Sequence, residues 1–305
     1  MQKWRKLGQI LKPNTHFPWM KSHSMVPTAD WLHGDMFRVY ISGRDDENRS
    51  QIGFFDLDIS NPIKSAVIQE TPVLKHGELG CFDDNGVTPS CIVTIEDKKY
   101  LYYIGWKPRS TTRMSLHIGL AISLDGGNSF SRYSRATIVP DTDMEPYSIL
   151  TAPYVLKDGE LWRLWYVSGE GWKSPDLPLY NIKTAISSDG IHWDRRGEVS
   201  IDFVSDDEVS LARPCVVKNG NVYRMWYSVK KNGGNYRMGY AESVDGISFE
   251  RMDHVLTGLA PSPSGWDSEM IEYPCVINHK GAYYMFYNGN DYGRDGVGLA
   301  VLEED

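Results

Sequence analysis

Residues 212–246 read ARPCVVKNGNVYRMWYSVKKNGGNYRMGYAESVDG, and three short elements within this stretch recur along the chain. The first, residues 212–217, is a β-prone run built around a proline. The second, residues 222–227, consists mainly of aromatic and β-branched residues. The third, residues 241–246, has the pattern Ala-x-Ser-x-Asp-Gly and is followed by an aromatic residue. Asp-Gly between strand-like runs predicts a hairpin turn, because glycine readily adopts the positive φ angle of such a turn.

The repeat is marked by five prolines separated by 62, 64, 61 and 60 residues: Pro27, Pro89, Pro153, Pro214 and Pro274. Each unit predicts four antiparallel strands, which is one blade of a β-propeller. The last unit lacks a fourth strand, and residues 4–11 resemble one, so we expect the N-terminal strand to join the last blade and close the ring. The sequence thus predicts an all-β fold, a five-bladed β-propeller with four strands per blade, in a single domain spanning residues 1–305.

Composition excludes several classes of protein. The chain has 305 residues and a net charge of −8, which argues against binding to duplex nucleic acid. No apolar run is long enough to span a membrane, and residues 1–13 lack the apolar core of a signal peptide. The four cysteines form no Cys-x-x-Cys motif, so we expect buried thiols of a reduced, cytoplasmic protein without a metal or cofactor.

Acidic residues recur upstream of several of the repeat prolines. The first strand of each blade lines the channel of a propeller, so these carboxylates are expected to converge on the axis. Carboxylates in one cavity repel one another, which raises the pKa of one and leaves another ionised. Such a pair can carry out glycosyl transfer, so the catalytic candidates are Asp84, Glu208 and Glu269. The structural alternative is that each binds backbone N–H groups at a strand entrance.

Other polar and aromatic residues are candidates for substrate binding: His23, Arg44, Asp83, Glu145, Arg213, Glu272 and Trp106. An arginine fork suits carboxylates and phosphates, and histidine titrates near neutral pH. An indole ring can stack on a sugar. The alternatives are a channel-lining salt bridge for Arg213, a structural role for His23 and core packing for Trp106.

The pattern Ala-Arg-Pro-x-Val, then Tyr-Arg-Met-Trp-Tyr-Ser, then Ala-x-Ser-x-Asp-Gly resembles the five-bladed glycosidase superfamily. This superfamily includes glycoside hydrolase families 32, 43, 62 and 68 and the mannoside phosphorylases of family 130. In the hydrolases, inner-strand carboxylates of blades 1, 2 and 3 act as base or nucleophile, orienting group and acid. The resemblance implies matches at Asp83 or Asp84 and at Glu145, whereas Ser22-His23-Ser24 stands where blade 1 would carry an aspartate.

The function expected from these observations is that of a carbohydrate-active enzyme acting on a glycosidic bond in the central channel by paired-carboxylate chemistry. Its partner would be a carbohydrate or glycoconjugate. One alternative is a glycosyltransferase or phosphorylase, which would hold a nucleotide-sugar or phosphate near Arg213. Another alternative is a non-catalytic, glycan-binding propeller. The missing acid of blade 1 favours both alternatives over simple hydrolysis.

Overall fold

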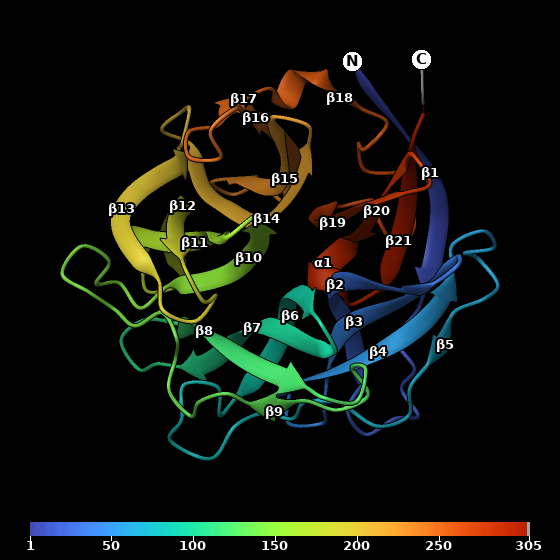
Figure 1. Ribbon diagram of the computed structural model, residues 1–305, viewed down its shortest axis with the longest axis horizontal. Helices are drawn as coiled ribbons and strands as arrows, with labels where there is room; N and C mark the ends of the chain where they lie inside the picture. Colours follow the sequence, from blue (N-terminus) through green and yellow to red (C-terminus); the bar gives the residue numbers. More distant parts are fainter. Residues whose placement is uncertain (304–305) are drawn as a thin grey trace.

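Consecutive strands pair antiparallel with one another in the computed structural model, which describes residues 1–303 (Figure 1). The first two runs of paired strands are β2 (Ser22–His33), β3 (Met36–Arg44), β4 (Ser50–Asp58) and β5 (Val67–Ile68), then β6 (Gly86–Ile95), β7 (Lys98–Pro108), β8 (Met114–Ser123) and β9 (Ser131–Arg132). The next two are β10 (Leu150–Asp158), β11 (Leu161–Ser174), β12 (Leu177–Ser187) and β13 (Asp194–Ile201), then β14 (Glu208–Asn219), β15 (Val222–Lys231), β16 (Arg237–Ser243) and β17 (Glu250–Arg251). These runs lie around a central axis, which is consistent with the predicted repeat (Figure 1).

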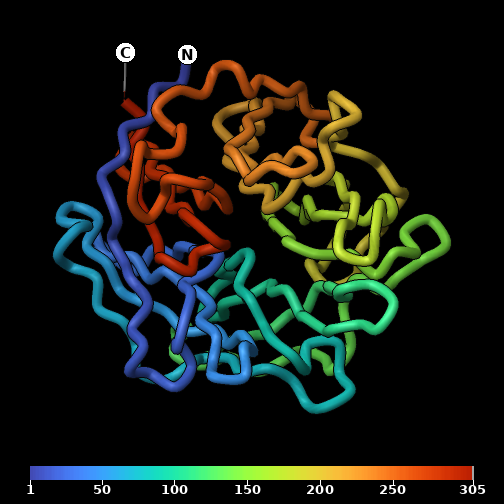
Figure 2. Tube along the Cα trace, turned by 180° about the vertical axis from the view of Figure 1, so that it is seen from behind, coloured from blue at the N-terminus to red at the C-terminus, as the bar shows by residue number. Residues whose placement is uncertain are grey.

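The two ends of the chain meet in one sheet. Strand β1 (Gln2–Leu11) pairs antiparallel with β21 (Val297–Leu302) and parallel with the short β18 (Leu256–Thr257). Strands β20 (Ala282–Asn288) and β19 (Glu272–His279) complete the order β18-β1-β21-β20-β19. Figure 2 shows the N-terminal segment in blue beside the C-terminal segments in red. A sheet edge that would otherwise be open is thereby covered.

Helical structure is slight. It consists of a 3-10 turn, η1 (Asp253–Val255), and one short helical turn, α1 (Asn290–Gly293), in the described residues. Within residues 1–303, no helix has the length and apolar character needed to cross a membrane.

The innermost strands share an irregularity that turns side chains toward the axis. Val26, Ala152, Arg213 and Tyr273 each precede a repeat proline and have φ angles of 54°, 46°, 53° and 56°. The strand register shifts at the same four places. A left-handed conformation outside glycine costs on the order of 1–3 kcal/mol, and it persists where the surrounding structure enforces it. All four side chains line the central cavity, so the bulges build its wall.

Each Ser-x-Asp-Gly turn follows the third strand of its own run and forms a hydrogen bond to the run before it. Within each turn the serine hydroxyl accepts from a glycine N–H, for example Gly190 N to Ser187 Oγ at 2.9 Å. An aromatic residue from the previous run then donates to a turn carbonyl. The pairs are Tyr40 Oη to Gly127 O at 3.1 Å, Tyr102 Oη to Gly190 O at 2.8 Å and Trp165 Nε1 to Gly246 O at 2.9 Å. The repeated aromatic residues therefore both fill the space between runs and cap the turns.

Three of the four cysteines have the buried, structural role expected for them, whereas Cys81 is half-buried. All four are free thiols, and Cys91, Cys215 and Cys275 are buried. Their sulfur atoms accept from main-chain N–H groups of the next inner strand: Val155 N at 3.3 Å, Val276 N at 3.1 Å and Ala29 N at 3.3 Å. These small side chains permit close approach of adjacent inner strands around the axis.

Candidate functional site

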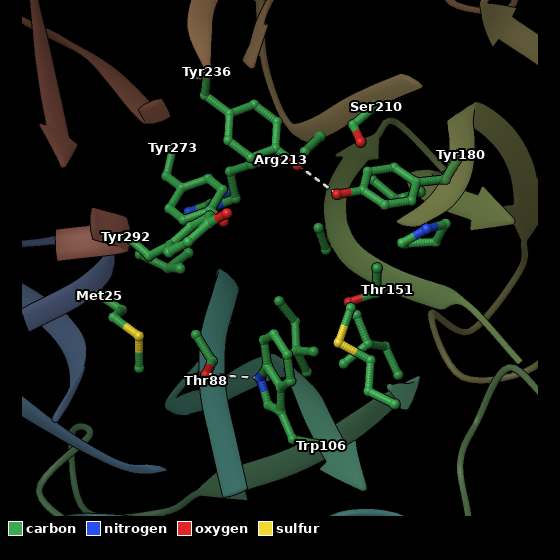
Figure 3. A pocket seen from close by; sticks show the side chains of 18 of the residues that line it. Met25, Thr88, Trp106, Thr151, Tyr180, Ser210, Arg213, Tyr236, Tyr273 and Tyr292 are labelled. Carbon is green, nitrogen blue, oxygen red and sulfur yellow. Dashed lines mark hydrogen bonds between the residues drawn. The ribbon is translucent and has the colours of Figure 1, made fainter. Parts of the chain in front are cut away.

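The inner strands enclose a cavity of about 180 Å³ on the central axis (Figure 3). Residues that precede the repeat prolines contribute to every side of it: Val26, Thr88, Ala152, Arg213 and Tyr273. Further lining comes from β7, β8, β12 and β15. The part of the sequence that specifies the fold therefore also specifies the site.

Aromatic side chains dominate two sides of the cavity. Tyr236 lies with its ring centroid 5.9 Å from that of Tyr273 and 6.4 Å from that of Tyr292. The hydroxyls of Tyr236 and Tyr180 form a hydrogen bond with each other. Figure 3 shows Trp106 on the other side, where its indole N–H donates to Thr88 Oγ1 at 3.2 Å. Flat rings with polar edges are suited to hold a sugar ring.

The cavity is lined by cations that have no acidic partner. Arg44, Arg113, Arg213 and Lys230 line it, and none of them takes part in an ion pair within residues 1–303. Lys230 Nζ instead lies 5.6 Å from the centroid of the Tyr236 ring. The sole carboxylate among the described lining residues belongs to the exposed Asp176. The site therefore attracts anions.

Arg213 is the most deeply placed of these cations. It is 1% exposed, and its Nη2 donates to Pro27 O at 3.2 Å and to Thr28 Oγ1 at 3.1 Å. Its Nε and Nη1 are buried without a hydrogen-bond partner among the described residues. An unsatisfied buried guanidinium is unfavourable, so an acceptor from a ligand would be bound favourably there.

Glu272 lies on β19, immediately before Tyr273. The side chain is fully buried, and neither carboxylate oxygen has a hydrogen-bond partner in the part of the chain that the structure describes. Burial raises the pKa of this carboxyl well above its ordinary value, although the nearby Lys230 opposes the shift. Burial therefore favours the neutral form of the Glu272 carboxyl behind the cavity wall. It is not among the lining residues, so the expected contact with substrate is not direct.

The structure does not bring the three predicted catalytic carboxylates together. Asp84 accepts from Gly80 N at 2.8 Å and pairs with Lys107 Nζ at 3.3 Å. The Glu208 carboxylate binds both Nη atoms of Arg251, at 2.7 and 2.9 Å. Glu269 is exposed. None of the three is among the described residues that line the cavity, so the expected convergence on the axis is wrong for them.

A repeated cluster within single runs explains the positions of two upstream carboxylates, Asp83 and Glu145. Each of the two is bound by a tyrosine of the second strand and by an arginine from the outermost strand. Asp83 accepts from Tyr103 Oη at 2.9 Å and Arg132 Nε at 2.8 Å. Glu145 accepts from Tyr166 Oη and Arg195 Nη1, both at 2.8 Å. Asp83 and Glu145 thus lie outside the cavity, because their partners hold them within their own sheets.

His23 is also displaced from the cavity lining. It is 8% exposed and its Nδ1 lies 2.7 Å from Ser22 Oγ. Burial, together with the positive charge of Arg44, lowers the pKa of the imidazole to about 4. Of the other predicted binding residues, Arg44, Arg213 and Trp106 do line the cavity.

The neutrality of His23 gives a testable prediction. Its imidazole signals are expected to titrate with a midpoint near pH 4, because protonation would place a charge in a buried site beside Arg44. Nuclear magnetic resonance titration, with His23→Gln used to assign the signal, measures this. A midpoint at the ordinary value of 6.5 would show that the side chain is solvated.

Several lining residues were not predicted from the sequence: Arg113, Tyr180, Lys230, Tyr236 and Tyr292. One signal could have identified Lys230. It lies three residues after Tyr227, as Trp106 lies three residues after Tyr103, so it occupies the same place in the repeat. Arg113, Tyr236 and Tyr292 lie outside the β-strands, and Tyr180 lies within β12 before the part that carries the repeated motif.

Solved structures show which class of fold this is. The chain is similar to a glycoside hydrolase, with a TM-score of 0.79, 18% identity and coverage of 99% of this chain and 92% of that one. It is also similar to a structure from the GH130 family of mannoside phosphorylases (TM-score 0.75, 13% identity, 98% and 93% coverage) and to a thermostable family-43 glycoside hydrolase (TM-score 0.68, 14% identity, 96% and 92% coverage). The fold is that of the glycosidase-like β-propellers.

Comparison of sequences identifies the family to which the chain belongs. It is 42% identical over 301 residues to uncharacterized protein MT1551 of Mycobacterium tuberculosis strain CDC 1551 / Oshkosh, covering 98% of this chain and 99% of that protein. Uncharacterized protein Rv1502 of Mycobacterium tuberculosis strain H37Rv matches with the same identity and coverage. The chain belongs to the family of these mycobacterial proteins. No protein-family model matches it.

Proposed function

We propose that this protein is a carbohydrate-active propeller that transfers a glycosyl group with the help of an anionic co-substrate, as glycosyltransferases and phosphorylases do. The strand pairings support a finer description of its fold: one domain with five blades, in which β1 completes the last blade. In this arrangement all five blades contribute side chains to the central cavity, which makes it the proposed substrate site.

One observation carries the proposal. Within residues 1–303, four cations line the cavity without ion pairs, while the predicted catalytic carboxylates are engaged elsewhere or exposed. Two-carboxylate hydrolysis needs an acid and a base on either side of the scissile bond. A cationic, tyrosine-lined cavity instead suits a ligand that combines a sugar with negative charge.

A second candidate function follows from the same lack of an acid and base pair. A protein that binds a glycan without catalysing a reaction would need the aromatic wall and the cations of the cavity. It would not need a catalytic carboxylate. Saturable glycan binding without turnover would favour this non-catalytic function over transfer.

The experiment compares variants on an array of glycans and nucleotide-sugars, with binding and turnover read by mass spectrometry. Asp84→Asn and Glu269→Gln are expected to lower turnover by no more than about twofold, because their side chains lie outside the cavity. Arg213→Gln is expected to weaken binding about 10- to 100-fold, since hydrogen bonds to a charged group are strong.

The opposite pattern would overturn the proposal. Loss of turnover in Asp84→Asn and Glu269→Gln, with folding intact by circular dichroism, would support a two-carboxylate mechanism instead. Glu208→Gln is unsuitable for this comparison, because it weakens the buried contact with Arg251 and is expected to reduce stability.

A further inference from the structure

The central cavity adjoins a second lobe of about 170 Å³. Five residues line both spaces: Met25, Arg44, Trp106, Arg113 and Met114. The second lobe has a different chemistry from the tyrosine-lined one. Its remaining walls are mostly polar: Asn48, Ser50, Asn85, Lys107 and Pro108. No carboxylate is found among the described residues that line it.

Two arginines give this lobe its charge. Arg44 is half-buried, and its Nη1 donates to Asn48 Oδ1 at 3.2 Å. Arg113 reaches the lobe from the exposed rim, with its main-chain N–H fixed by Pro175 O at 2.8 Å. Burial lowers the pKa of the Arg44 guanidinium, and the charge of Arg113 adds to this effect, although Asp291 opposes it. Two like charges therefore face one space, and neither forms an ion pair within residues 1–303.

The third cation of the lobe is already neutralised. Lys107 Nζ donates to Gly80 O at 2.8 Å and pairs with Asp84 at 3.3 Å. Arg44 and Arg113 thus contribute two positive charges to the lobe that no ion pair neutralises within residues 1–303. A phosphate monoester carries about 1.5 to 2 negative charges at neutral pH, whereas a carboxylate carries one. Paired guanidinium groups also match the oxygen geometry of phosphate.

We propose that the second lobe is a subsite for a phosphoryl group, bound by Arg44 and Arg113, with the sugar placed beyond Trp106 against the tyrosines of the central cavity. This inference rests on the proposed function and deepens it by naming the anion and its location. The phosphoryl group is either attached to the sugar, as in a sugar phosphate or nucleotide-sugar, or free beside it. Asn48, Ser50 and Asn85 supply uncharged hydrogen-bonding groups around it.

Isothermal titration calorimetry on the full chain tests the subsite. The probes are inorganic phosphate, pyrophosphate, a hexose 1-phosphate and a nucleotide-sugar, with sulfate, a uronic acid and a neutral hexose for comparison. The phosphorylated probes are expected to bind more tightly than the uronic acid and the neutral hexose. Arg44→Gln and Arg113→Gln are each expected to weaken phosphoryl binding about 10- to 100-fold. Arg196→Gln is the matched control, because Arg196 is exposed and pairs with Asp194 away from the cavity.

The arms separate the possible outcomes. Binding of inorganic phosphate alone identifies a free co-substrate, and binding that requires the sugar phosphate identifies an attached group; both support the subsite. Phosphoryl binding that survives Arg44→Gln and Arg113→Gln but is lost in Arg213→Gln would overturn the inference while the proposed function stands. Preference for the uronic acid would overturn the assignment of phosphate. Failure of every probe, with the chain folded, would contradict both the subsite and the proposed function.

Discussion

Arg195→Met is expected to lower the free energy of unfolding by about 3–5 kcal/mol, because it leaves the buried Glu145 carboxylate without its charged partner. Arg195 Nη1 lies 2.8 Å from Glu145 Oε2, and the two side chains are 8% and 1% exposed. The same arginine also donates from Nη2 to Pro140 O at 2.6 Å. Urea unfolding followed by tryptophan fluorescence measures the change.

The neighbouring residue provides a matched control. Arg196 also forms an ion pair, with Asp194 at 2.7 Å, but the side chains are 67% and 52% exposed. Arg196→Met is expected to leave stability unchanged, because water already solvates both charges. Equal effects of the two substitutions would show that the Glu145 cluster does not act as a buried structural contact.

The cluster of Glu145, Tyr166 and Arg195 also explains why the sequence alone predicted the fold better than the site. The period of about 60 residues is visible in the recurring prolines, aromatic residues and Asp-Gly turns. Each of these three features has a local physical reason for its position. The turn at Asp189, for example, is organised by the hydroxyl of Ser187, two residues before it. Patterns of this kind can be recognised without knowledge of distant contacts.

The site depends on contacts that the repeat does not reveal. Asp83 and Glu145 recur upstream of the prolines just as catalytic groups would, but their partners Arg132 and Arg195 lie about 50 residues further along the chain. Each carboxylate is held by an arginine beside it, and the sequence does not show which arginine that is. Arg213 was predicted correctly as a lining residue, because its position before the proline fixes its direction.

Glu272→Gln is expected to abolish a pH-dependent loss of stability. In the folded protein the buried carboxyl stays protonated above its ordinary pKa of 4.5, whereas in the unfolded chain it ionises there. The folded state then binds more protons, so the contribution of Glu272 to stability is greatest below pH 4.5 and falls as pH rises toward the folded pKa. The slope is about 1.4 kcal/mol per pH unit in that window. Glutamine has the same shape and cannot ionise.

The measurement is the difference in unfolding free energy between wild type and Glu272→Gln at pH 5, 6 and 7. Other groups, His23 among them, titrate identically in both proteins and cancel in the difference. Any constant cost of burying an amide shifts all three values equally and leaves the slope intact. Glu269→Gln, an exposed change three residues away, is expected to leave the wild-type slope unaltered. A difference that stays flat with pH would mean that Glu272 is ionised in the folded protein, and Lys230 would then be its counter-ion rather than a free cation of the cavity.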